Sequence, residues 1–206
     1  MILDISQPLK EGVPVWPGDT EFAFDLTWKK EQTGSVNVGR LEMSTHTGTH
    51  ADAPFHFRDD GARIATLDLE AFLGSARVIE IHGEQSIGAE ELRRHALEGI
   101  ERLLIKTGSW PSRETFPAAI THLSPDVAPY LAEKGVRLVG VDVPSVDPLD
   151  SKDLPTHEAL RENGIHILEG LVLDRIEPGD YDLVALPLAL EEAYASPVRA
   201  VLRTLS

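Results

Sequence analysis

Four side chains that could bind a metal ion or move a proton lie within eleven residues of one another: His46, His50, Asp52 and His56. Imidazole nitrogens and carboxylate oxygens are ligands that suit zinc or manganese. The residues between them are mostly small or turn-forming: Gly48 permits a positive φ, and Pro54 favours an extended conformation in the residue before it. We therefore expect an irregular segment here, not a helix, in which His46, His50 and Asp52 converge on one ion.

Three protein ligands are the pattern of a catalytic zinc site, because a closed structural site usually has four, often cysteines. A divalent ion with an open position lowers the pKa of its bound water toward neutrality. It also polarises a carbonyl group and stabilises the oxyanion that forms on attack. This chemistry hydrolyses an amide or a related acyl bond. The alternative is a polar loop that binds no metal.

The composition limits the other classes of protein that the chain can belong to. A length of 206 residues favours one domain, residues 1–206, that can bury a core without covalent staples. The chain has no cysteine, which excludes disulfides, thiolate ligands and cysteine nucleophiles and fits a reducing cytoplasm. A net charge of −15 makes nucleic acids and anionic membranes poor partners.

Sequence motifs of other kinds are missing too. The first residues have no basic segment, so we expect no signal peptide, and the apolar run at residues 183–190 is too short to span a bilayer. Neither a Gly-x-Ser-x-Gly elbow nor a phosphate-binding glycine loop occurs in the sequence. The usual local signatures of a serine hydrolase and of a nucleotide-binding enzyme are therefore absent from the sequence.

The order of the expected elements indicates an α/β protein with a mixed sheet. Apolar alternation predicts a half-buried strand over residues 22–28, and the alternation that follows changes phase at Gly39, as a β-bulge requires. This hairpin leads directly into the histidine-rich segment. Apolar runs bounded by turn residues predict strands at 2–5, 78–81, 103–105, 136–143, 165–168, 182–188 and 198–205. Start and stop signals predict helices at 67–73 (closed by Gly74), 89–97, 124–135 and 156–163.

The segment His-Thr-Gly-Thr-His-Ala-Asp-Ala-Pro-Phe-His at residues 46–56 resembles the signature of the metal-dependent cyclase-like hydrolases. Three further stretches resemble the bacterial kynurenine formamidase (arylformamidase) branch of that family: Leu-Asp-Ile-Ser, Val-Trp-Pro-Gly-Asp-Thr and Gly-Val-Asp-Val-Pro-Ser-Val-Asp-Pro. The resemblance covers essentially the whole chain. It implies a layered β/β/α swivelling-domain-like fold, which periodicity does not predict. It also implies hydrolysis of N-formyl-L-kynurenine to L-kynurenine and formate in tryptophan breakdown.

The resemblance also implies roles for residues that are distant in the sequence. His157 and Glu169 join the set of ligands, and Asp52 bridges two zinc ions per subunit, with manganese or another divalent ion as the alternative. Taken alone, His157 could bond locally at a helix start, and Glu169 could be an exposed acid. The resemblance makes His56 the catalytic acid/base, since an imidazole titrates near the working pH. The alternative is that His56 is itself a ligand or supports one.

Trp16 lies in a loop of prolines and glycines, where a large flat ring can stack on an aromatic substrate. The alternative for Trp16 is a cap on the core, and Phe55 and Phe57 could line the same pocket or pack inward. We expect a small aromatic formamide as substrate, no nucleic-acid or membrane partner, a cytoplasmic location and, from the resemblance, a homodimer. Two other functions stay open: hydrolysis of a cyclic aromatic amide such as isatin, or metal binding without catalysis on the same fold.

Overall fold

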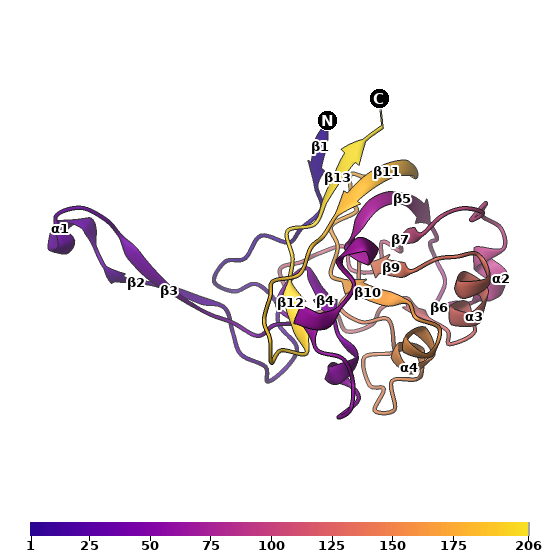
Figure 1. Cartoon of the computed structure of the whole chain (residues 1–206), viewed down its shortest axis with the longest axis horizontal. Helices are drawn as coiled ribbons and strands as arrows, with labels where there is room; N and C mark the ends of the chain where they lie inside the picture. The colour runs from indigo at the N-terminus through magenta and orange to yellow at the C-terminus, as the bar shows by residue number, and fades with distance from the viewer. Residues whose placement is uncertain (206) are drawn as a thin grey trace.

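The computed structural model describes residues 1–205, and its body is built on a nine-stranded mixed sheet (Figure 1). The strand order is β1-β13-β11-β5-β7-β9-β10-β4-β12. The four central strands β5, β7, β9 and β10 are parallel, and the strands outside them pair in antiparallel fashion. The bounds of the nine strands are Ile2–Asp4 (β1), His50–Asp52 (β4), Leu73–Glu80 (β5), Arg102–Lys106 (β7), Leu138–Val141 (β9), His166–Glu169 (β10), Gly179–Val184 (β11), Ala195–Pro197 (β12) and Val201–Thr204 (β13).

Both faces of the central strands β7, β9 and β10 are buried, and successive residues point to opposite faces. In β7, Leu103 and Ile105 pack into one hydrophobic cluster, whereas Leu104 packs into the other. Three helices supply residues to the first cluster: α2 (Ala89–Leu92), α3 (Val127–Glu133) and α4 (Pro155–Glu162). The short strands β6 (Ser86–Ile87) and β8 (His122–Leu123) pair beside these helices. This is the α/β class with a mixed sheet that the sequence predicts.

A two-stranded ribbon projects from the body, and we call residues 23–42 the arm (Figure 1). It consists of β2 (Ala23–Trp28) and β3 (Val38–Glu42), joined by α1 (Lys30–Thr33) and a turn at Gly34, where φ is 75°. The expected strand over 22–28 exists, but the prediction that it is half-buried is wrong, because every residue of β2 except Ala23 is exposed. The bulge lies between Leu26 and Trp28, in the strand that faces Gly39.

Two expected helices differ from the structure. Residues 67–73 form no α-helix: two 3-10 turns, Ile64–Thr66 and Leu69–Phe72, precede β5. Gly74 lies inside β5, where it pairs with Leu183 of β11, so sheet pairing replaces the expected helix end. The helix expected over 89–97 ends at Leu92. Within residues 1–205, none of the helices has the length and apolar character that a bilayer crossing requires.

Candidate metal centre and active site

The residues that carry His50 and Asp52 form β4, a buried strand of the large sheet, so the expectation of an irregular segment is wrong for them. Strand β4 pairs with β10 in antiparallel register, which places Glu169 opposite His50. Directly paired residues project from the same face of a sheet. The register therefore brings a carboxylate from far along the chain to the histidine-rich segment.

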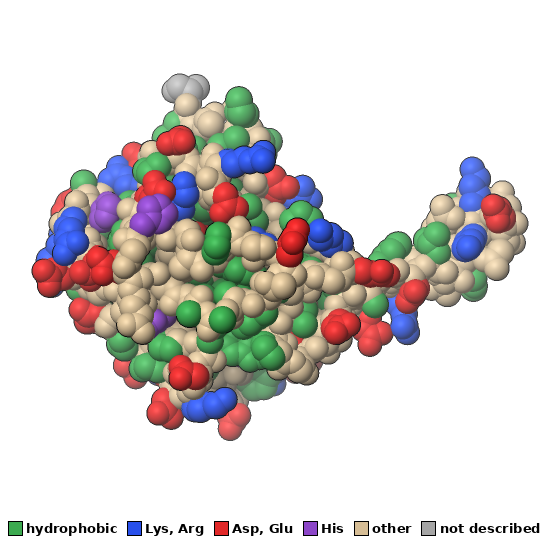
Figure 2. Space-filling view, turned by 180° about the vertical axis from the view of Figure 1, so that it is seen from behind, with side chains coloured by type: hydrophobic (Ala, Val, Ile, Leu, Met, Phe, Trp, Pro, Cys, Tyr) green, Lys and Arg blue, Asp and Glu red, His purple; other side chains and the backbone are tan. Residues whose placement is uncertain are grey.

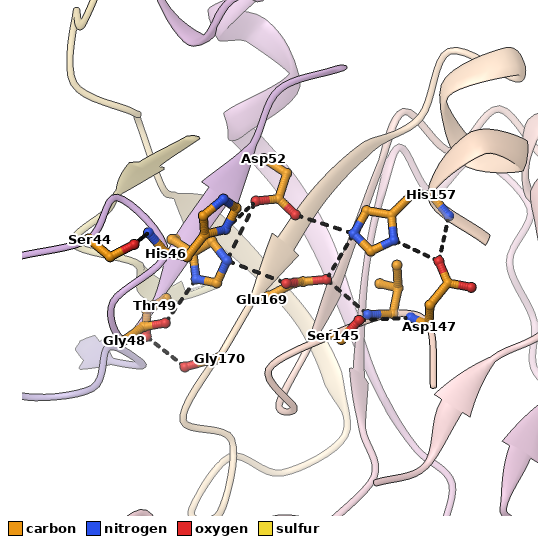
Figure 3. A network of polar contacts seen from close by, with 12 residues as sticks. Ser44, His46, Gly48, Thr49, Asp52, Ser145, Asp147, His157, Glu169 and Gly170 are labelled. Carbon is orange, nitrogen blue, oxygen red and sulfur yellow. Dashed lines mark hydrogen bonds and ion pairs between the residues drawn. The ribbon is translucent and has the colours of Figure 1, made fainter. Parts of the chain in front are cut away.

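Five side chains with nitrogen or oxygen donors converge at this point of the sheet: His46, His50, Asp52, His157 and Glu169 (Figure 3). His46 Nδ1 lies 3.1 Å from Asp52 Oδ1, and His157 Nε2 lies 3.5 Å from Asp52 Oδ2. His50 Nε2 lies 3.3 Å from Glu169 Oε2. All five are buried except His46, which is partly exposed. Glu169 is thus no exposed acid.

The donor atoms form two groups that share Asp52. One group is His46, His50 and Asp52, and the other is Asp52, His157 and Glu169; within each group the donor atoms lie within 4.8 Å of one another. Among the described residues, His46 Nε2, His50 Nε2 and both carboxylate oxygens of Asp52 are buried without a hydrogen-bond partner. Such atoms cost roughly 1–3 kcal/mol each when unsatisfied. The two groups therefore fit two divalent ions that share Asp52, and the nitrogen and oxygen donors suit zinc or manganese.

Hydrogen bonds to Nδ1, the ring nitrogen on the side away from Asp52, orient His50 and His157. The carbonyl oxygen of Gly48 lies 3.0 Å from His50 Nδ1 and can only accept, so Nδ1 carries the proton and Nε2 faces the carboxylates. His157 Nδ1 lies 2.7 Å from Asp147 Oδ2, which also accepts from the backbone N–H of His157 at 3.0 Å. Such outer contacts fix the ring orientation of metal-binding histidines. Sequence reasoning assigned no role to Asp147, although it lies in the stretch at residues 140–148 that carries the family resemblance.

The carboxylates change the proton affinities of the surrounding histidines. Burial lowers the pKa of His50, but the contacts with Glu169 and Asp52 outweigh it and raise the pKa to about 9. Burial also lowers the pKa of His157, and Asp147, Asp52 and Glu169 together raise it to about 10. Burial raises the pKa of Asp52, but the neighbouring histidines, His46 first, hold it well below the usual range. The cluster therefore concentrates negative charge that favours a cation.

His56 belongs to neither group of donors, although it lies beside both. It is in the 3-10 turn Pro54–His56, and its ring centroid is 4.2 Å from that of His46 and 6.1 Å from that of His157. The ring of Tyr194 stacks on His56 with 20° between the planes. Burial lowers the pKa of His56 to about 4, assisted by the neighbouring histidines and opposed by Asp52. The imidazole is therefore neutral at pH 7 and can accept a proton, whereas the sequence predicted titration near the working pH.

A cavity of about 260 Å³ opens onto His46, His56, His157 and Glu169. Its apolar lining includes Trp16, Trp110 and Phe116, and the rings of Trp16 and Phe116 meet edge-on with centroids 5.2 Å apart. Trp16 is 41% exposed, so it lines the cavity and does not cap the core. Sequence reasoning missed Trp110 and Phe116, because their loop contains no motif and only the fold brings it to the site.

Phe55 and Phe57 do not line this cavity. The guanidinium of Arg63 lies 3.8 Å from the ring centroid of Phe55. Phe57 meets the ring of His157 edge-on, with centroids 5.3 Å apart, and contributes to a separate cavity. Of the three aromatic residues singled out in the sequence, Trp16 alone lines the cavity that opens onto the donor cluster.

The fold and this cluster of donors are those of a metal-dependent hydrolase, and the chain belongs to the cyclase family. The family model described as "Putative cyclase" matches residues 3–148. A solved structure described as a potential metal-dependent hydrolase with cyclase activity superposes with a TM-score of 0.83 at 30% identity, covering 98% of this chain and 96% of the other. Isatin hydrolase A from Labrenzia aggregata has the same fold, with a TM-score of 0.84 at 23% identity over 98% of this chain and 93% of the other.

Curated relatives are more similar in sequence. The kynurenine formamidase of Geobacillus thermodenitrificans (strain NG80-2) is 58% identical over 201 residues, which are 98% of this chain and 96% of the relative. The kynurenine formamidase of Bacillus thuringiensis (strain Al Hakam) is 56% identical over 201 residues, with the same coverage of both chains.

Proposed function

We infer that the protein is an amidohydrolase that converts N-formyl-L-kynurenine into L-kynurenine and formate. The observation that carries this inference is the position of the aromatic-walled cavity, which opens directly onto the histidine and carboxylate cluster. A formanilide has a flat ring next to the bond to be cleaved, so the ring and the formyl group can occupy the two parts of the cavity together. The similarity to relatives named kynurenine formamidase supports the same substrate.

The five donor residues would hold two zinc ions, with manganese or another divalent ion as the alternative. His46, His50 and Asp52 would hold one ion, and Asp52, His157 and Glu169 the other. Bound ions of this kind lower the pKa of water and polarise a carbonyl group. Asp147 and Gly48 keep the histidine rings in the orientation that this requires.

His56 and the aromatic wall supply the remaining chemistry. The neutral imidazole of His56 accepts a proton from the attacking water and returns it to the aniline nitrogen as the C–N bond breaks. Trp16 and Phe116 hold the substrate ring, and aromatic contacts of this kind contribute about 0.5–1.5 kcal/mol beyond the burial of area. We propose that Asp19, which also lines the cavity, pairs with the ammonium group of the substrate's amino-acid part.

Other properties expected from the sequence are proposals too. We propose that the enzyme acts in tryptophan breakdown as a homodimer, without a nucleic-acid or membrane partner. The cytoplasmic location stays a prediction, which cell fractionation can test.

An assay with quantified metal tests the proposed function. Protein loaded with zinc should release L-kynurenine from N-formyl-L-kynurenine, followed by product absorbance, and chelation should abolish the activity. Isatin is the matched comparison, since it is a cyclic aromatic amide. Faster turnover of isatin would replace the proposed substrate, and turnover of neither compound by metal-loaded protein would indicate a metal-binding protein without this activity.

A further inference from the structure

Residues 107–121 connect β7 with β8, and we call them the aromatic loop because Trp110 and Phe116 of the cavity lining belong to it. The loop contains no helix or strand. Loops of this length without secondary structure of their own are usually functional or disordered. The two rings can bind a flat substrate in one place only if other contacts hold the loop.

Asp142, which follows β9 directly, holds the beginning of the aromatic loop. Its buried carboxylate accepts hydrogen bonds from the backbone N–H of Thr107 at 3.0 Å, from the Thr107 hydroxyl at 2.6 Å and from the backbone N–H of Gly108 at 2.9 Å. Farther along, Trp110 Nε1 donates to the carbonyl oxygen of Thr115 at 3.0 Å. The start of the loop is therefore fixed to the end of a central strand, and the indole ring is fixed within the loop.

Arg113 connects the middle of the aromatic loop to two strand ends. Many lysine and arginine side chains lie at the surface among acidic ones, as Figure 2 shows for one face of the molecule, but that of Arg113 is only 14% exposed. Its Nη2 donates to the carbonyl oxygens of Asp142 at 3.3 Å and Leu171 at 3.0 Å, and its Nη1 donates to Asp174 Oδ2 at 2.8 Å. Leu171 lies two residues beyond Glu169, the last residue of β10. One guanidinium therefore joins the loop to the strand end that carries a candidate metal ligand.

The same guanidinium begins a row of contacts that leads to the substrate cavity. It lies 5.6 Å from the ring centroid of Trp110, within the range of a cation–π contact. The centroid of Trp110 lies 6.4 Å from that of Phe116, which in turn lies 5.2 Å from that of Trp16. Arg113 itself does not line the cavity. Any effect of Arg113 on a substrate therefore passes through these rings.

We propose that Arg113 is the positioning residue for the aromatic part of the substrate. It fixes the rings of Trp110 and Phe116 relative to the strand end that carries Glu169. This inference rests on the proposed function and adds to it a determinant of substrate specificity. A ring wall that is already held before the substrate arrives loses little conformational freedom on binding. Arg113 therefore favours formamides with a flat ring, and it takes no part in the hydrolysis of the formyl group.

The contacts of Arg113 require a guanidinium. A guanidinium is planar, presents its donors in a fixed fork and stacks on aromatic rings, whereas an ammonium is a compact point charge. Arg113→Lys therefore keeps a charge next to Asp174 but loses the flat contact with Trp110 and the paired carbonyl contacts. Arg113→Gln removes the charge as well. Lysine would restore a role that is limited to the ion pair, but it would not restore the position of the rings.

Steady-state kinetics of the zinc-loaded full chain test the proposal on N-formyl-L-kynurenine and on N-butylformamide, which has no ring. Both Arg113 variants should raise KM for N-formyl-L-kynurenine roughly five- to ten-fold, the effect of one weakened aromatic contact, while kcat changes less than about two-fold. Catalytic efficiency on N-butylformamide and the zinc content should stay as in the unmodified protein. Calorimetric titration with L-kynurenine should show the same rise in dissociation constant without turnover.

The matched control is Arg77→Gln. Arg77 also pairs with an aspartate, Asp180, and donates to a backbone carbonyl oxygen, but it does not line the cavity, so KM should not change. A second variant, Asp174→Asn, removes only the ion pair of Arg113 at a position that is 49% exposed, so it tests the proposal even if the Arg113 variants fail to fold. It should raise KM for N-formyl-L-kynurenine by a smaller factor and leave turnover of N-butylformamide unchanged.

Three results would overturn the role of Arg113: losses of equal size on both formamides, normal KM in Arg113→Lys, or unchanged KM in every variant. The proposed function fails in a different way. If the unmodified zinc-loaded protein neither hydrolyses N-formyl-L-kynurenine nor binds L-kynurenine, the proposed function is wrong, and the role assigned to Arg113 falls with it.

Discussion

Asp147 Oδ2 lies 2.7 Å from Nδ1 of His157, and this contact determines that the other nitrogen of the ring faces Asp52. The replacement Asp147→Asn should therefore weaken metal binding at the group formed by Asp52, His157 and Glu169. Loss of such an outer contact typically costs 10–100-fold in metal affinity. Competition with a chelator measures the change.

The control for this variant is Asp150→Asn, because Asp150 is exposed in the same loop. Equal affinities in the Asp147 and Asp150 variants would show that Asp147 serves the loop and not the metal centre.

Two groups of donors that share Asp52 predict two ions per chain. Zinc content of carefully prepared protein should approach two per chain, and Glu169→Ala should reduce it toward one and lower the activity. Elemental analysis alongside the assay measures both. A zinc content that stays at one per chain under excess zinc, together with full activity of the Glu169 variant, would contradict the prediction of a second ion.

His56→Ala should keep the metal but lose activity, since His56 lies outside both groups of donors. General acid/base assistance is worth about two to four powers of ten in rate. His82→Ala, on the surface away from the cavity, is the matched control. Metal loss that parallels the loss of turnover would make His56 a ligand, and the assigned role would be wrong.

Trp16→Ala should reduce catalytic efficiency on N-formyl-L-kynurenine at least several-fold, while the metal content stays normal. The reason is that Trp16 contacts Phe116 in the cavity wall and belongs to neither hydrophobic cluster of the described residues. The catalytic efficiency of the same variant on a small formamide without a ring should fall much less. Equal losses on both substrates would mean that Trp16 supports the histidine segment instead of the substrate ring.

The stability of chelator-treated protein and that of zinc-loaded protein should change with pH in opposite directions. In metal-free protein the pKa values of His50 and His157 are raised to about 9 and about 10, above the ordinary value of 6.5. Their contribution to stability is therefore complete below pH 6.5 and is lost as the pH rises through 9 and 10. The lowered pKa of Asp52 acts only at acid pH and does not affect this window.

Thermal unfolding measured with excess chelator should accordingly show a melting temperature that falls between pH 6.5 and 9.5, by about 2–4 °C for each 1 kcal/mol lost. With zinc the melting temperature should rise between pH 6 and 8, because metal binding displaces protons from its ligands. The same slope in both conditions would contradict the assignment of these histidines to the metal centre.

Much of the candidate site is local in the sequence. His46, His50 and Asp52 are close enough along the chain that their convergence needs only one short segment, so residue type and spacing were sufficient to predict it. The choice between a ligand and a neutral base for His56 depends on burial beside Tyr194, which spacing does not reveal.

The fold, like the site, has elements that the sequence predicts and elements that it does not. Apolar periodicity predicted the central strands, because their alternate residues pack into two cores, and it predicted the α/β class. It also predicted a half-buried strand over residues 22–28, since an apolar face looks the same whether its partner is the same chain or another molecule. In place of the helix expected at 67–73, residues 69–72 form a 3-10 turn, and Leu73 begins β5, which pairs with the distant strand β11.

The sequence by itself determined the metal-binding chemistry, the α/β class and the resemblance to the formamidases, since each depends on residues that are near one another or on the order of elements. Only the tertiary structure decided which distant groups complete the site. The register of β4 and β10 sets Glu169 opposite His50, and the loop with Trp110 and Phe116 closes the cavity. The pairing of β4 with β10 joins residues more than a hundred positions apart, and the cavity wall joins loops that are distant in the chain, so no local pattern encodes either contact.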